Sequence, residues 1–84
     1  MADLPAPERL DLRGLRCPLP VLRLEARARA LPAGSRLEVL ADDPIARVDI
    51  PHAMREAGHA CEEVSAPENT RDYCVFEVTL GGKG

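Results

Sequence analysis

LDLRGLRCPLPVLRLEARARAL, residues 10–31, changes from strand-like to helix-like periodicity within one short segment. Its first four residues alternate leucine with a charged residue, which predicts a short strand, and Gly14 ends that strand. After Pro18, apolar residues recur at helical spacing, which predicts a helix over 19–31. The face of this helix that we expect to be buried consists of Leu19, Leu22, Ala26 and Ala30. The segment therefore predicts a strand, a tight turn and a helix.

The rest of the chain adds a strand, a helix and two more strands. We predict a strand over 36–41, a helix over 44–57, and strands over 60–66 and 72–80 joined by a turn over 67–70. Asp42 and Asp43 precede Pro44, and we interpret both carboxylates as caps of the second helix rather than as a catalytic pair. Gly58 is a natural helix end. Pro51 lies inside the helix and should kink it or divide it in two.

The order β-α-β-α-β-β predicts an α/β fold. The first β-α-β unit should form a right-handed parallel crossover, and the last two strands an antiparallel hairpin. The result is a four-stranded mixed sheet with two helices, most simply on one face. We expect residues 1–8 to form a loose tail, residues 9–80 a single domain, and residues 81–84 a frayed end.

Composition narrows the possible functions. An 84-residue chain that is 45% hydrophobic and 30% charged is one globular domain, too small to enclose a large substrate pocket. Two aromatic residues and a net charge of −3 argue against direct nucleic-acid binding. Neither a signal peptide nor a membrane-spanning run is recognisable, so we expect a cytoplasmic protein with no membrane partner. Three cysteines form no disulfide framework.

Cys17 is the residue most suited to chemistry, because it lies where the first strand passes into the first helix. We expect Cys17 near the N-cap, where unpaired N–H groups and the helix dipole favour a thiolate and lower the pKa. The Leu19 N–H should be the donor that meets the sulfur, while Pro18 and Pro20 stiffen the turn. Residues 9–29 hold six arginines and two acidic residues, a net charge of +4, whereas the rest carries −7.

The sequence near Cys17 offers neither a second cysteine nor a histidine that could act together with its thiol. The Cys-Pro-Leu-Pro turn lacks a second cysteine, so dithiol exchange is excluded, and neither histidine is near Cys17 in the sequence. A lone nucleophilic thiolate can accept a sulfur atom as a persulfide and pass it on. The alternative is that Cys17 is only a small buried apolar residue at a helix start. The two prolines and the basic residues nearby argue against this alternative. Asp11 could steady the turn or bond Arg13 or Arg16.

The other candidate residues favour structural roles. We predict that Cys74 packs in the core and that Cys61 is a slightly exposed thiol without a chemical role. The second interpretation of Cys61 is a resolving cysteine that forms a disulfide with Cys17. His52, His59 and the cysteines match no zinc pattern, and no metal or cofactor is expected. His59 should meet the helix dipole at the end of the second helix. We expect the arginines that share a helix with Cys17 to dock partner proteins through opposite charge; they are Arg16, Arg23 and Arg27.

The chain resembles the TusA/SirA-like sulfur-carrier family. The hallmark string Asp-x-x-Gly-Leu-x-Cys-Pro-x-Pro is filled by Asp11, Gly14, Leu15, Cys17, Pro18 and Pro20. A second family-like set is Asp42-Asp43-Pro44, Asp49-Ile50-Pro51 and Gly58-His59. The resemblance covers residues 9–80, and Cys61 departs from the plain apolar residue expected there. It implies a two-layer sandwich with both helices on one face and a persulfide on Cys17.

The resemblance also implies a role in a sulfur relay. Members of the family pass sulfur from a cysteine desulfurase or a rhodanese-type donor to an acceptor protein. The pathways are tRNA thiolation, molybdenum-cofactor synthesis and sulfur oxidation. The expected function is therefore that of a covalent sulfur carrier with sulfurtransferase activity. Two alternatives are a non-catalytic adaptor that binds through the basic helix and a redox sensor that forms a Cys17–Cys61 disulfide.

Overall fold

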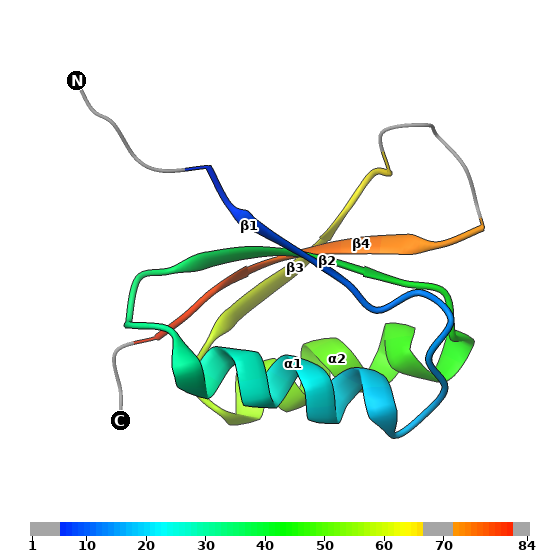
Figure 1. Cartoon of the computed structure of the whole chain (residues 1–84), viewed down its shortest axis with the longest axis horizontal. Helices are drawn as coiled ribbons and strands as arrows, with labels where there is room; N and C mark the ends of the chain where they lie inside the picture. Colours follow the sequence, from blue (N-terminus) through cyan, green and yellow to red (C-terminus); the bar gives the residue numbers. More distant parts are fainter. Residues whose placement is uncertain (1–5, 67–71, 82–84) are drawn as a thin grey trace.

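The computed structural model describes residues 6–66 and 72–81 and contains the six predicted elements in the predicted order. They are β1 (Glu8–Asp11), α1 (Leu19–Ala30), β2 (Arg36–Ala41), α2 (Pro44–Glu56), β3 (Ala60–Val64) and β4 (Cys74–Thr79). Both helices lie on the same face of the sheet, so the predicted two-layer sandwich is confirmed (Figure 1). No helix among the described residues is long and apolar enough to cross a membrane.

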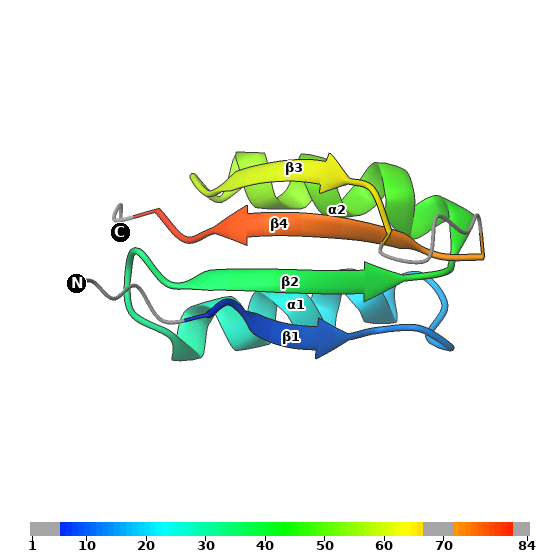
Figure 2. The same cartoon turned by 90° about the horizontal axis from the view of Figure 1, so that it is seen from above.

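The sheet has the strand order β1-β2-β4-β3 (Figure 2). β1 and β2 are parallel, as expected for strands joined by a crossover helix, while β4 is antiparallel to both β2 and β3. The predicted parallel unit and C-terminal hairpin are therefore correct. The topology brings the turn after β1 and the loop after β2 to the same end of the sheet, because parallel strands end on the same side.

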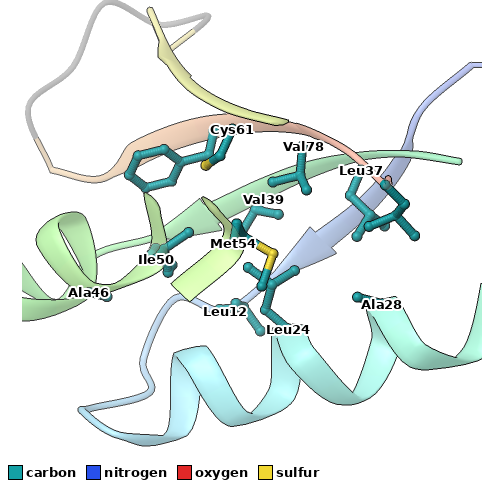
Figure 3. Close-up of a cluster of buried hydrophobic side chains, with 13 residues drawn as sticks. Leu12, Leu24, Ala28, Leu37, Val39, Ala46, Ile50, Met54, Cys61 and Val78 are labelled. Carbon is teal, nitrogen blue, oxygen red and sulfur yellow. The ribbon is translucent and has the colours of Figure 1, made fainter. Parts of the chain in front are cut away.

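The hydrophobic core lies between the sheet and the two helices (Figure 3). Alternate residues of β2 and β4 point into it, as the strand pattern predicts, and Phe76 is its largest fully buried side chain. α2 contributes Ala46, Ile50 and Met54, which lie on its predicted apolar face. The helix continues from Pro44 to Glu56 and buries side chains on both sides of Pro51. The expectation that the proline divides it is therefore wrong.

The predicted buried face of α1 is wrong. The helix buries Pro20, Leu24 and Ala28, while Leu22 is 52% exposed and Leu19 is 45% exposed. Ala26 and Ala30 do not belong to the buried face either. The helix has two neighbouring apolar stripes at helical spacing, so periodicity alone does not choose between them. The sheet selects the stripe that contains Leu24, and two large apolar side chains are left on the surface after Cys17.

The ends of the domain differ slightly from the prediction. Glu8 is paired with Leu37 in the β1–β2 ladder, so it belongs to the domain and not to the tail. Gly81 donates its N–H to Nδ1 of His59 at 2.9 Å, so this residue is held and not frayed. The His59 ring therefore accepts a backbone hydrogen bond from the end of the domain, and its contact with the helix dipole stays a prediction. The predicted turn over 67–70 and residues 82–84 lie outside the described residues.

Candidate functional site

The segment between β1 and α1 is a pair of backbone turns with Cys17 at its exposed tip. The Leu12 N–H extends the parallel ladder by bonding the Leu40 carbonyl at 2.8 Å, and the Leu15 N–H bonds the Leu12 carbonyl at 3.2 Å. Gly14 has a φ of 88°, a left-handed conformation that favours glycine. Leu15 packs against the core from this segment. The motif glycine and leucine therefore shape the turn and anchor it.

The start of α1 lies next to Cys17, as predicted, but the donor expected for its sulfur is engaged elsewhere. Pro18 is the N-cap and Leu19 the first helical residue, so Cys17 lies one residue before the cap. The Leu19 N–H bonds the Arg16 carbonyl at 2.8 Å, which makes it unavailable to the sulfur. Pro18 follows a cis peptide bond and Pro20 is buried. The expected stabilisation of a thiolate by the Leu19 N–H is therefore wrong.

Asp43 connects this turn to α2. Its side chain is 5% exposed; Oδ1 accepts the Ile45 N–H at 3.1 Å and Oδ2 accepts the Cys17 N–H at 2.6 Å. The first bond is the predicted helix cap. The second bond does not follow from the sequence pattern, and it fixes the backbone of Cys17 to the N-terminus of α2.

Asp42 also binds the turn instead of capping α2. Its Oδ1 accepts the Gly14 N–H at 3.0 Å and a guanidinium N–H of Arg16 at 3.2 Å. The interpretation of Asp42 as a helix cap is therefore wrong, because its bonds run to the Cys17 turn. Together, Asp42 and Asp43 hold this turn from the loop after β2.

The two carboxylates differ in a way that a matched pair of variants tests. Asp43→Asn leaves one acceptor oxygen for two N–H groups, so we expect a loss of about 1–3 kcal/mol in the free energy of unfolding. Asp42 uses a single oxygen for both bonds, which an asparagine can supply, and Asp42→Asn should change it by less than about 1 kcal/mol. Urea unfolding measures both, and equal losses would contradict this assignment.

Asp11 bonds Arg13, which is one of its two expected partners. The guanidinium donates to both carboxylate oxygens, at 2.9 and 2.7 Å, and the Arg13 N–H donates at 3.1 Å. These hydrogen bonds lower the pKa of Asp11 to about 2. Arg13 also lies over the Tyr73 ring, 4.7 Å from its centroid. Asp11 therefore braces the strand end that leads into the turn.

The Cys17 sulfur is exposed and faces a carboxylate of α2. Its thiol donates to Oδ2 of Asp49, with an Sγ–Oδ2 distance of 3.6 Å. Partial loss of water around the sulfur, the hydrogen bond to Asp49 and the charges of Asp49 and Asp43 raise the pKa of Cys17 above its ordinary value. The expectation of a lowered pKa is therefore wrong, because desolvation of the sulfur and the two carboxylates all disfavour the thiolate.

The other two cysteines are less accessible. Cys61 is 4% exposed and lies in the core, so its prediction as an exposed bystander is wrong (Figure 3). Cys74 is half-buried, packs against the core as predicted, and donates its thiol to the Ala41 carbonyl at 3.3 Å. Burial raises the pKa of both thiols. Burial of Cys61 also leaves the Cys17–Cys61 disulfide of a redox sensor without structural support.

The three arginines predicted for docking have different surroundings. Arg16 pairs with Asp42 at 3.2 Å. Arg27 forms a two-pronged ion pair with Glu8, at 2.6 and 2.8 Å, and so ties α1 to β1. Arg23 is exposed and makes no ion pair with another described residue. Arg23 is therefore the member of the set whose charge is most open to a partner.

No metal site accompanies this thiol in the part of the chain that the structure describes. Residues 6–66 and 72–81 contain no group of three or more histidine, cysteine or acidic side chains that could hold a metal ion. His59 is engaged with Gly81, and His52 is exposed on α2. The site is a single exposed thiol on a turn held by acidic side chains from the neighbouring loop and helix.

Sequence reasoning identifies Cys17 but misses part of its surroundings. It assigns Asp43 to helix capping alone and places Asp49 only within a family-like string. Both aspartates are distant in sequence from Cys17, by 26 and 32 positions. The paired aspartates before Pro44 are a usable signal, because a single N-cap needs only one carboxylate.

Sequence comparisons find relatives that match most of the chain. A sequence model of the family described as "Sulfurtransferase TusA" matches residues 8–79. "Sulfur carrier protein TusA" of Pseudomonas syringae pv. syringae (strain B728a) is 44% identical over 66 residues, covering 79% of each chain. Its namesake in Pseudomonas putida (strain W619) is 44% identical over 75 residues, covering 89% of this chain and 94% of that protein.

A solved structure has the same fold. The crystal structure of a SirA-like protein from Desulfitobacterium hafniense superposes with a TM-score of 0.69. The match covers 89% of this chain and 97% of that protein, at 24% sequence identity. This likeness supports the arrangement of four strands and two helices described above.

Proposed function

The chain belongs to the TusA sulfurtransferase family, and we propose from this membership and the Cys17 geometry that it carries sulfur as a persulfide on Cys17. The observation that supports this most is the exposure of the Cys17 sulfur on a turn fixed by Asp42 and Asp43. A carrier must present one sulfur atom to two different proteins, so an exposed thiol on a held backbone suits the task. Cys61 and Cys74 are more enclosed.

The proposed chemistry is two successive sulfur exchanges. Cys17 attacks the outer sulfur of a donor persulfide, a new S–S bond forms, and the donor's own S–S bond breaks. The donor cysteine leaves with the electron pair and takes up the proton that Cys17 gives up. An acceptor thiol then attacks the outer sulfur of the Cys17 persulfide in the same way. Sulfur passes from one thiol to the next without an added oxidant or reductant.

We propose a cysteine desulfurase or a rhodanese-type protein as donor and a sulfur-accepting protein as the partner downstream. The candidate pathways are tRNA thiolation, molybdenum-cofactor synthesis and sulfur oxidation, all within the cytoplasm. Docking would use the exposed charge of Arg23 on α1, with Arg16 and Arg27 contributing if a partner's carboxylates compete with Asp42 and Glu8.

The proposal is tested by loading the full chain with sulfur. The protein is incubated with a cysteine desulfurase and cysteine, or with a rhodanese and thiosulfate, separated from the donor, and weighed by intact-mass spectrometry. We expect a gain of one sulfur atom that a thiol reductant removes. An unchanged mass with both donors would contradict the proposal and favour the adaptor alternative, in which α1 binds a partner without chemistry.

A further inference from the structure

Asp49 lies beside the reactive sulfur on a rigid element. It occupies the second turn of α2, next to Ile50, which is fully buried in the core. Its own side chain is half-buried, and its Oδ2 is 3.6 Å from the Cys17 sulfur, in position to accept the thiol proton. The turn that carries Cys17 is held to the start of the same helix by Asp43. The two groups are therefore held next to each other by separate anchors.

We propose that Asp49 keeps the proton on the unloaded Cys17 thiol, so that the empty carrier stays unreactive until a donor protein docks. This inference rests on the proposed function, because it concerns the same sulfur before loading. Asp49 acts on Cys17 and not on the transferred sulfur, so it is a positioning residue. A thiol is a far weaker nucleophile than its thiolate. Protonation would therefore protect an exposed cysteine from oxidants and small electrophiles.

The charges around the sulfur favour the protonated form. Asp49 and Asp43 face it from α2 and the residue before α2, and their charges act on the thiol in the same direction as the hydrogen bond. The segment that carries Cys17 also holds two cations, but Arg16 is paired with Asp42 and Arg13 with Asp11. The basic residues that suggested an acidified thiol are therefore offset locally by carboxylates.

Loading changes this balance. In a Cys17 persulfide, the ionising atom is the outer sulfur, which lies one S–S bond, about 2 Å, beyond Sγ. The Asp49 hydrogen bond seen in the structure is made to Sγ, an atom that no longer carries a proton once it is bonded to a second sulfur. The hydrogen bond that disfavours ionisation of the empty thiol is therefore lost when the thiol becomes a persulfide. A single residue thus distinguishes the empty carrier from the loaded one.

The test measures how fast Cys17 is alkylated at different pH values in the full chain. Iodoacetamide is the probe, and the alkylated tryptic peptide 17–23 is quantified by mass spectrometry. For Asp49→Asn, we expect the midpoint of the rate profile to fall and the rate at pH 7 to rise about three- to tenfold, since one pKa unit is a factor of ten in thiolate. An unchanged midpoint would overturn the proposal.

A matched variant controls for the loss of one negative charge. Glu56 is exposed at the far end of α2 from Cys17, so Glu56→Gln changes the charge of the same helix at a distance. Its alkylation profile should match that of the parent chain. A shift as large as that of Asp49→Asn would also overturn the proposal, because the effect would then be one of net charge. Circular dichroism confirms that each variant is folded.

Sulfur loading of the same proteins separates this inference from the proposed function. If the parent and Asp49→Asn both load sulfur but have the same alkylation midpoint, the role of Asp49 fails and the carrier function stands. If the midpoint shifts as expected but neither protein gains sulfur from a donor, the carrier function fails and the effect of Asp49 on the thiol stands.

Discussion

The Cys17→Ser variant should gain no sulfur from either donor system, while it remains as stable as the parent chain. Serine provides no sulfur atom to form a persulfide, so loss of loading should be complete. The side chain is exposed, and the bonds that hold the turn are made by the Cys17 backbone and by neighbouring residues. We therefore expect the free energy of unfolding to change by less than about 0.5 kcal/mol. Intact-mass spectrometry and urea unfolding measure the two quantities.

Cys74→Ser is the matched control for this substitution. The Cys74 thiol donates to the Ala41 carbonyl, and a serine hydroxyl keeps a donor at that position. This variant should load one sulfur atom like the parent. Sulfur uptake by Cys17→Ser at the parent level would refute the assignment of Cys17, whereas loss of uptake in both variants would point to a role of Cys74.

The Leu24→Ala variant should lose a large part of the stability of the domain. Leu24 is fully buried between α1 and the sheet, and truncation of such a leucine leaves a cavity that costs about 2–5 kcal/mol. Leu22→Ala makes the same change two residues earlier on the same helix, where the side chain is 52% exposed. Its effect should stay within about 0.5 kcal/mol.

Urea unfolding of the two leucine variants tests directly which face of α1 is buried against the sheet. A larger loss for Leu22→Ala than for Leu24→Ala would mean that the helix buries the stripe expected from the sequence. The exposed stripe matters for function because Leu19 and Leu22 then lie on the surface of the helix that follows Cys17. A folded Leu22→Ala variant therefore also removes apolar surface from this part of the molecule without disturbing the core.

Much of the fold can be predicted from local patterns. Alternation in 36–41 and 72–80 identifies the central strands, and the proline and glycine positions locate the helix ends. Handedness and pairing rules then give the parallel crossover and the terminal hairpin. These features depend on residues that are close together in the sequence, so they can be predicted without knowledge of tertiary contacts.

The errors arise where tertiary contacts decide between locally equivalent arrangements. α1 has two apolar stripes, and only the sheet distinguishes Leu24 from Leu22. Cys61 has Glu63 as its alternation partner, yet β3 turns Cys61 into the core. Pro51 is expected to kink α2 or to divide it, and the division is wrong, because the buried residues on both sides of it belong to one helix.

The candidate site is predictable in its nucleophile but not in its electrostatics. Cys17 is marked by the two prolines that follow it, Pro18 and Pro20, and by the strand-to-helix transition. Its carboxylate neighbours come from the loop after β2 and from α2, and only the sheet topology brings Asp43 and Asp49 to the turn. The arginines are conspicuous in the sequence, but Arg16 and Arg27 are paired with acidic residues in the fold. The expected sign of the Cys17 pKa shift is wrong for this reason.

The most direct test of the carrier assignment is to locate the added sulfur after loading. Trypsin cuts after arginine and lysine, so the three cysteines fall on separate peptides, 17–23, 56–71 and 72–83. After the loaded protein is alkylated and digested, we expect the extra sulfur on peptide 17–23 alone. Sulfur on either of the other peptides, or on none of the three, would contradict the account.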